Sequence, residues 1–120
     1  MVRCLVAVFC GFLANPALAN DFMPVRDRSE FLNLIQEKQL RVGLYNLTLH
    51  VTPDGKIHGQ ALGWGITGTW DWQDGYFCRN MDWSGYEIGP DCQLVEARQG
   101  KTLRFTAEKG TGKSASFRLR

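Results

Sequence analysis

The chain has 120 residues, of which 14 are basic and 12 acidic, and with a formal net charge of +2 it is not expected to bind nucleic acid. The length suits one domain with one modest core and is too short for two. The longest apolar run, residues 4–14, falls well short of the roughly 20 residues that a bilayer span needs, so no stable membrane span is expected.

Residues 1–19 have the pattern of a cleaved secretory signal peptide. Arg3 supplies the positive charge, an apolar run follows, and Ala17 and Ala19 form an A-x-A cleavage site. We therefore expect the mature protein, residues 20–120, to be periplasmic or secreted and to form a single β-rich domain.

One amphipathic helix is predicted at the start of this domain, over residues 28–38. Asp27 precedes Glu30 by three positions, which is the spacing of a helix N-terminal capping box. Apolar residues then follow at helical spacing: Phe31, Leu32, Leu34 and Ile35. Because no second helix is predicted, the apolar face of this helix is expected to pack against a sheet.

From Leu40 onward the pattern alternates with period two, which is typical of β-strands. Residues 52–56, Thr-Pro-Asp-Gly-Lys, match a type I turn with a bulge and predict a tight hairpin. If Thr52 faces Lys56, then Leu49 lies opposite Gly59 and the inward faces of the two strands match.

The same register places His50 opposite His58 on the outward face of the hairpin. Two imidazoles could hold a transition metal weakly, or they could be a solvated pair. Two ligands are fewer than a structural or catalytic zinc site uses. No cofactor is predicted on this basis.

The remaining pattern predicts short antiparallel strands separated by glycine-containing turns. The expected strands are residues 41–45, 47–52, 56–61, 66–73, 75–83, 91–98, 102–108 and 114–119. Seven or eight such strands favour a small up-and-down barrel or a strongly twisted meander, with the helix plugging one open end or face.

One disulfide is predicted between Cys78 and Cys92. Cys4 and Cys10 fall in the signal segment, which leaves this pair in a compartment where disulfides persist. The two positions lie opposite each other about a centre at Gly85, and the closed loop would stabilise the fold by about 3 kcal/mol.

Two segments resemble nucleotide-binding motifs. Residues 63–68 fit G-x-G-x-x-G, and residues 107–114 fit a loose P-loop pattern. Both motifs bind phosphate at the N-terminus of a following helix, whereas the residues that follow here alternate as strands do. We therefore expect the first segment to allow strand bending or close packing and the second to be a hairpin turn.

Aromatic residues are concentrated between positions 64 and 86, where acidic residues are interleaved with them. They are expected either to fill the core of a small barrel or to form a platform that stacks a sugar or peptide ligand. The candidate ligand-binding residues are Trp64, Trp70, Trp72, Tyr76, Trp83 and Tyr86.

Four segments of the chain are similar to those of known proteins: residues 68–79, with the run Trp-x-Trp-x-Asp-Gly-Tyr-Phe-Cys-Arg, and residues 91–95, 103–106 and 114–120. They resemble a family of short exported proteobacterial proteins without an established activity, over nearly all of the mature chain. Some members are labelled dihydrodipicolinate reductase, which implies a cytoplasmic NADPH-dependent enzyme. This chain lacks the length and the βαβ unit of that enzyme, so no catalytic residues carry over.

The leading hypothesis is a non-catalytic exported β-barrel module that binds a small ligand, an envelope component or a protein partner, including as an inhibitor. The alternatives are an enzyme, either that reductase or a carboxylate-based hydrolase, and a structural envelope protein without a ligand. No serine lies in a nucleophile-elbow context, so no catalytic residue is assigned.

Overall fold

The structure is a computed structural model that describes Gly11 and residues 21–120. The predicted cleavage site, with Ala17 and Ala19, therefore lies outside the described residues, as does the predicted signal peptide apart from Gly11.

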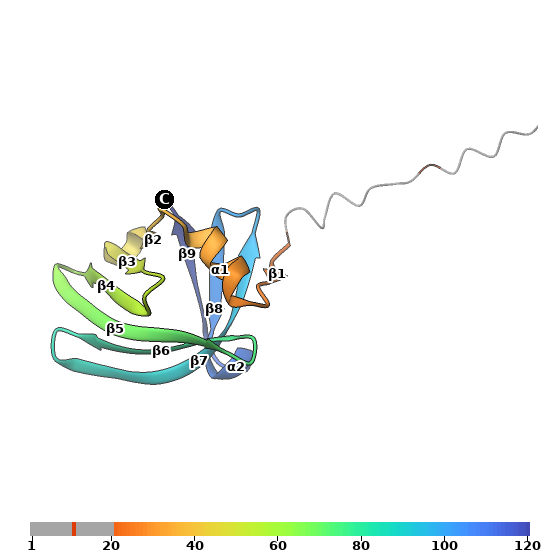
Figure 1. The fold of residues 1–120 in the computed structure, drawn as a ribbon. Coiled ribbons are helices and arrows are strands. Elements are labelled where there is room, and N and C mark those ends of the chain that lie inside the picture. The colour runs from red at the N-terminus through yellow and green to blue at the C-terminus, as the bar shows by residue number, and fades with distance from the viewer. Residues whose placement is uncertain (1–10, 12–20) are drawn as a thin grey trace, which may run out of the picture.

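Eight antiparallel strands form a closed barrel (Figure 1). Each strand pairs with the next along the chain, and the last returns to pair with the first. The strands are β2 (Leu40–Val42), β3 (Leu47–Val51), β4 (Lys56–Ala61), β5 (Trp64–Gln73), β6 (Tyr76–Trp83), β7 (Tyr86–Arg98), β8 (Thr102–Thr106) and β9 (Ser114–Leu119). The predicted barrel is thus confirmed, and its closure leaves few strand edges unpaired.

The helix α1 covers Arg28–Ile35 and so ends three residues before the predicted end. The Asp27 carboxylate accepts a hydrogen bond of 2.8 Å from the Glu30 amide, as the capping spacing predicts. Glu37 takes a left-handed backbone conformation with φ of 57°, which is incompatible with further helical turns.

The helix α1 lies at one end of the barrel, which we call the plugged end (Figure 1). It is anchored there by Phe31. Its side chain is 0% exposed, and its ring lies 5.2–5.4 Å from the rings of Trp70, Trp72 and Phe77. Clustered aromatic rings of this kind contribute both apolar burial and edge or face contacts. The short strand β1 (Met23–Pro24) pairs with the edge of β7 nearby.

The first hairpin has the predicted register. Leu49 lies opposite Gly59, and Val51 opposite Ile57. The turn is closed by a hydrogen bond from the Thr52 amide to the Lys56 carbonyl, and Gly55 has a φ of +84°. The Pro-Asp-Gly sequence therefore determines this hairpin locally.

Several predicted strand boundaries are wrong, including the start of β5, which lies at Trp64 rather than at residue 66. The strand expected over residues 41–45 ends at Val42, because a 3-10 turn (η2, Gly43–Tyr45) follows. The strand expected over residues 102–108 ends at Thr106, where the short α2 (Ala107–Gly110) begins. The strand expected to begin at residue 91 begins at Tyr86 instead.

The early start of β7 follows from a two-residue turn. Ser84 and Gly85 both have positive φ, 50° and 90°, as in the type I′ turns that join strands directly. A register shift follows, because Asp82 pairs with Glu87 whereas Met81 pairs with Gly89, which leaves Ile88 as the extra residue of a β-bulge.

The predicted disulfide is present. Cys78 and Cys92 lie directly opposite each other on β6 and β7 and are bonded, with a sequence separation of 14. Without the bulge, Asp91 rather than Cys92 would lie opposite Cys78.

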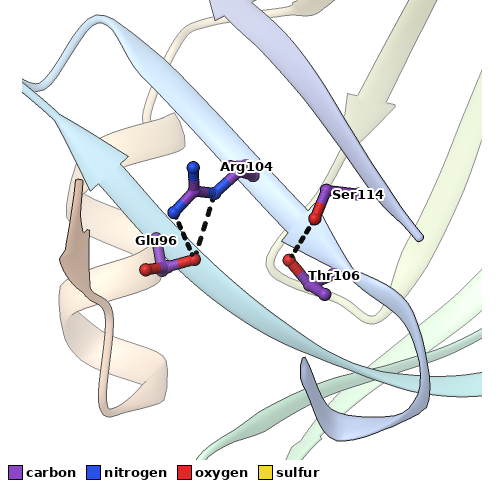
Figure 2. A network of polar contacts seen from close by, with 4 residues as sticks. All are labelled: Glu96, Arg104, Thr106 and Ser114. Carbon is purple, nitrogen blue, oxygen red and sulfur yellow. Dashed lines mark hydrogen bonds and ion pairs between the residues drawn. The ribbon is translucent and has the colours of Figure 1, made fainter. Parts of the chain in front are cut away.

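Polar contacts hold β7, β8 and β9 together on the outer surface of the barrel (Figure 2). The Arg104 guanidinium donates to a Glu96 carboxylate oxygen at 2.9 and 3.1 Å, and the hydroxyls of Thr106 and Ser114 lie 2.7 Å apart. Arg104 also lies over the ring of Phe22, 4.1 Å from its centroid. Phe22, which directly precedes β1, is thereby tied to the barrel wall.

Candidate functional site

The β4–β5 and β6–β7 turns lie at the barrel end away from α1, at the left of Figure 1, and we call this end the open end. A cavity of about 340 Å³ occupies this end. All of its lining residues are apolar or aromatic, and they include Leu47, Ile66, Met81, Trp83, Ile88 and Phe117. We call this cavity the outer chamber.

A small inward-facing residue, Ala61, lines this chamber directly. Toward the plugged end, inward-facing positions carry large buried side chains such as Trp70 and Phe77. The distribution of side-chain volume along the strands thus fills one end of the barrel and hollows the other.

A second cavity of about 200 Å³, the inner chamber, continues toward the plugged end. It shares Leu49, Met81 and Phe117 with the outer chamber. Its lining is apolar except for two side chains, Arg79 and Gln93. The interior therefore has an apolar mouth and two polar side chains at depth.

Arg79 lies on the same face of β6 as Phe77 and Met81, so its side chain enters the barrel. Its Nη1 donates a hydrogen bond of 2.7 Å to the Gly89 carbonyl. Burial lowers the pKa of Arg79, and the nearby negative charge of Asp91 opposes this shift. An arginine nevertheless stays protonated in proteins, so the inner chamber holds a positive charge.

The Asp91 carboxylate forms its hydrogen bonds with groups other than Arg79. It accepts hydrogen bonds of 3.1 Å from the Glu108 amide and 3.2 Å from the Gln93 side chain. Among residues 21–120, Arg104 and Glu96 form an ion pair with a nitrogen–oxygen distance below 4.0 Å. No carboxylate oxygen in these residues lies that close to the Arg79 guanidinium.

The rim of the open end exposes large apolar side chains. Leu44 is 82% exposed, Tyr86 70%, Trp64 61% and Leu62 58%. Trp64, Trp83 and Tyr86 together line a shallow depression beside the mouth. Contiguous patches of exposed apolar residues are candidate binding surfaces.

The six candidate aromatic residues are thus divided between several places. Trp64, Trp83 and Tyr86 lie at the open end. Trp70 is buried in the core, and Trp72 stacks on Phe31 in the plugged end. Tyr76 lies beneath Lys109 of α2, 5.5 Å from its ammonium. These six residues do not share one platform.

The histidine pair has the predicted geometry. His50 and His58 lie opposite each other in the β3–β4 ladder, with parallel rings whose centroids are 4.8 Å apart. Within residues 21–120 no three metal-ligating side chains come together, so weak metal binding by this pair stays a prediction.

Neither nucleotide-like segment has the structural context of a phosphate site. Residues 63–68 form a turn and the start of β5. Residues 107–113 join β8 to β9, and their α2 is four residues long, with left-handed conformations at Glu108 and Lys109. A hairpin turn, as predicted, occupies the second segment.

Arg79 was missed by the sequence analysis, although a signal for it exists. Phe77, Arg79, Met81 and Trp83 alternate along one strand, which places the arginine on an otherwise apolar face. An arginine on the inward face of a predicted barrel strand is the pattern that would have identified it.

No helix in the described part of the chain is long and apolar enough to cross a membrane. No protein-family model matches the chain, and comparisons with curated proteins and with solved structures also give no match.

Proposed function

We propose that this chain is an exported, non-catalytic binding protein that takes a small apolar molecule into the open end of its barrel. The observation that carries the proposal is the apolar outer chamber of about 340 Å³, which opens at a rim of exposed aromatic and aliphatic side chains.

The size and chemistry of the interior support this function. Ligand cavities in proteins typically enclose roughly 300–1,000 Å³ and are mostly apolar with a few polar groups. Transfer of apolar surface from water into such a site is favourable by about 25 cal/mol per Å². The Cys78–Cys92 disulfide and the predicted signal peptide favour a role outside the cytoplasm.

A titration with the neutral fluorescent probe N-phenyl-1-naphthylamine tests the proposal. The probe fluoresces in apolar surroundings, so the purified protein should give a saturable rise in emission. Ala61→Trp places an indole in the outer chamber and should abolish the saturable signal. The control Gln60→Trp adds the same side chain at an exposed position of the same strand and should bind the probe as the parent does.

Circular dichroism and thermal melting establish that both variants fold. If the folded parent gives no saturable signal, or if the two variants bind the probe equally well, the barrel interior is not the binding site.

A further inference from the structure

We infer that the ligand of this barrel is an amphiphile whose single carboxylate is bound by Arg79 at the base of the cavity and whose apolar tail points toward the rim. This inference rests on the proposed binding function and specifies the chemical class of its ligand.

The position of Arg79 supports this assignment. Its side chain lines the inner chamber beside Phe77 and Met81, below the fully apolar outer chamber. The hydrogen bond to the Gly89 carbonyl occupies one of the several N–H groups of the guanidinium. An acid that entered the cavity would meet the remaining donors, which are suited to bidentate pairing with a carboxylate.

The positive charge of Arg79 also favours a ligand with a carboxylate. A half-buried cation is unfavourable without a partner anion, and within the described residues no carboxylate lies within 4.0 Å of it. The closest candidate in the ladder, Asp91, already accepts from the Glu108 amide and from Gln93. Asp91 therefore acts on Arg79 only from beyond 4.0 Å, and a ligand carboxylate would supply the directly hydrogen-bonded anion that Asp91 does not provide.

The geometry of β6 sets the length of the tail. Arg79 and Trp83 are four residues apart on the same face of the strand, which corresponds to about 13 Å along it. This is the span of a medium-length alkyl chain. Such a tail would lie against Met81 and Ile66 and end at the aromatic rim.

The test compares decanoate with decan-1-ol, which have the same chain length and differ in charge. Each is titrated at neutral pH as a competitor of N-phenyl-1-naphthylamine. We expect the parent protein to bind decanoate at least about tenfold more tightly than the alcohol, as a charge-assisted hydrogen bond implies. Decyl phosphate as a third competitor distinguishes a carboxylate site from a general anion site, and decanoate should bind more tightly.

Arg79→Met should remove the preference for decanoate while the neutral probe and decan-1-ol still bind. Arg79→Lys, which keeps the charge but not the planar fork, should retain part of the preference. Arg118→Met, at an exposed position of β9, is the matched control and should leave the preference unchanged.

A readout on the parent protein keeps the test independent of variant folding. In ¹⁵N-labelled protein, the Nε–Hε signal of Arg79 should shift with decanoate and not with decan-1-ol. The inference is overturned if the parent binds decanoate and decan-1-ol equally well, or if it binds decyl phosphate more tightly than decanoate. It is also overturned if the Arg79 Nε–Hε signal does not shift with decanoate, or if folded Arg79→Met keeps the full preference for decanoate. Failure of the parent to bind the neutral probe would instead overturn the proposed function itself.

Discussion

Two glycines of the segment over residues 63–68 differ in their surroundings although both fit the same motif. A Cβ on Gly68 would overlap the Asn80 carbonyl oxygen and lie 2.9 Å from the Met81 side chain. A Cβ on Gly65 would meet nothing within 4 Å. Gly68 is therefore required by the close approach of β5 and β6 beside the cavity, whereas Gly65 is not.

This contrast gives the first prediction. Gly68→Ala should lower the free energy of unfolding by about 1–3 kcal/mol, because the added methyl group forces the strands apart. Gly65→Ala is the matched control and should change it by less than about 1 kcal/mol. Urea unfolding followed by tryptophan fluorescence measures both values, and equal losses in the two variants would contradict the packing role of Gly68.

Arg79 shows how far prediction from sequence reaches for a single residue. Alternation along residues 77–83 determines which face it shares, so its inward direction was predictable in principle. Its partners were not, because the Gly89 carbonyl reaches it only through the bulge after Ser84 and Gly85. Contacts across an irregular ladder depend on backbone geometry that local residue types do not encode.

At the scale of elements, the β6–β7 hairpin combines a tight turn, a bulge and a disulfide. The double variant Cys78→Ser, Cys92→Ser should lose about 3 kcal/mol of unfolding free energy, since the cross-link no longer limits the unfolded chain. Chemical denaturation of parent and variant provides the measurement. The parent treated with dithiothreitol should match the variant, and an unchanged stability in both would show that the bond adds nothing.

The two hairpins on either side of β5 explain which elements were predictable. Residues 53–55, Pro-Asp-Gly, restrict their own backbone angles, and so the register of β3 with β4 followed from the sequence. The second hairpin contains an additional residue whose position is decided by packing in the closed barrel, so the start of β7 was not predicted. The same holds for α2, where Glu108 and Lys109 adopt left-handed conformations that their residue types disfavour.

At the scale of the whole molecule, closure of the barrel depends on a short seam. β2 and β9 pair at Leu40 with Leu119 and at Arg41 with Arg118, and reciprocal hydrogen bonds between Gln39 and Arg120 extend this ladder. The β5–β6 ladder, by contrast, runs from Ile66 to Gln73. Closure could be predicted from the need to remove sheet edges, but the shortness of the seam could not.

The seam should open more easily than the rest of the wall. Amides of Gln39 and Arg120 are expected to exchange with solvent through a local opening of lower free energy than amides in the middle of the β5–β6 ladder, such as Thr69 and Asn80. Native-state hydrogen exchange followed by NMR resolves these sites. Equal protection in both ladders would mean that the barrel opens only as a unit.

The cavity is a property of the whole molecule, and it could not be predicted from the sequence pattern. Ala61 faces inward beside larger residues, and only the closed barrel shows that it lines a cavity at the open end. The aromatic cluster was recognisable in the sequence, but its division between the plug and the rim depends on which end of each strand α1 covers.

Because of the bulge at Ile88, the Cys78–Cys92 disulfide can form only when β6 and β7 pair in the correct register. A hairpin that formed through Ser84 and Gly85 without the extra residue would leave Cys78 opposite Asp91, with the Cys92 thiol on the other face of the sheet. Such a misaligned chain could not form the bond. Disulfide formation during folding therefore traps the one alignment in which Arg79 lies beside the Gly89 carbonyl, within the interior.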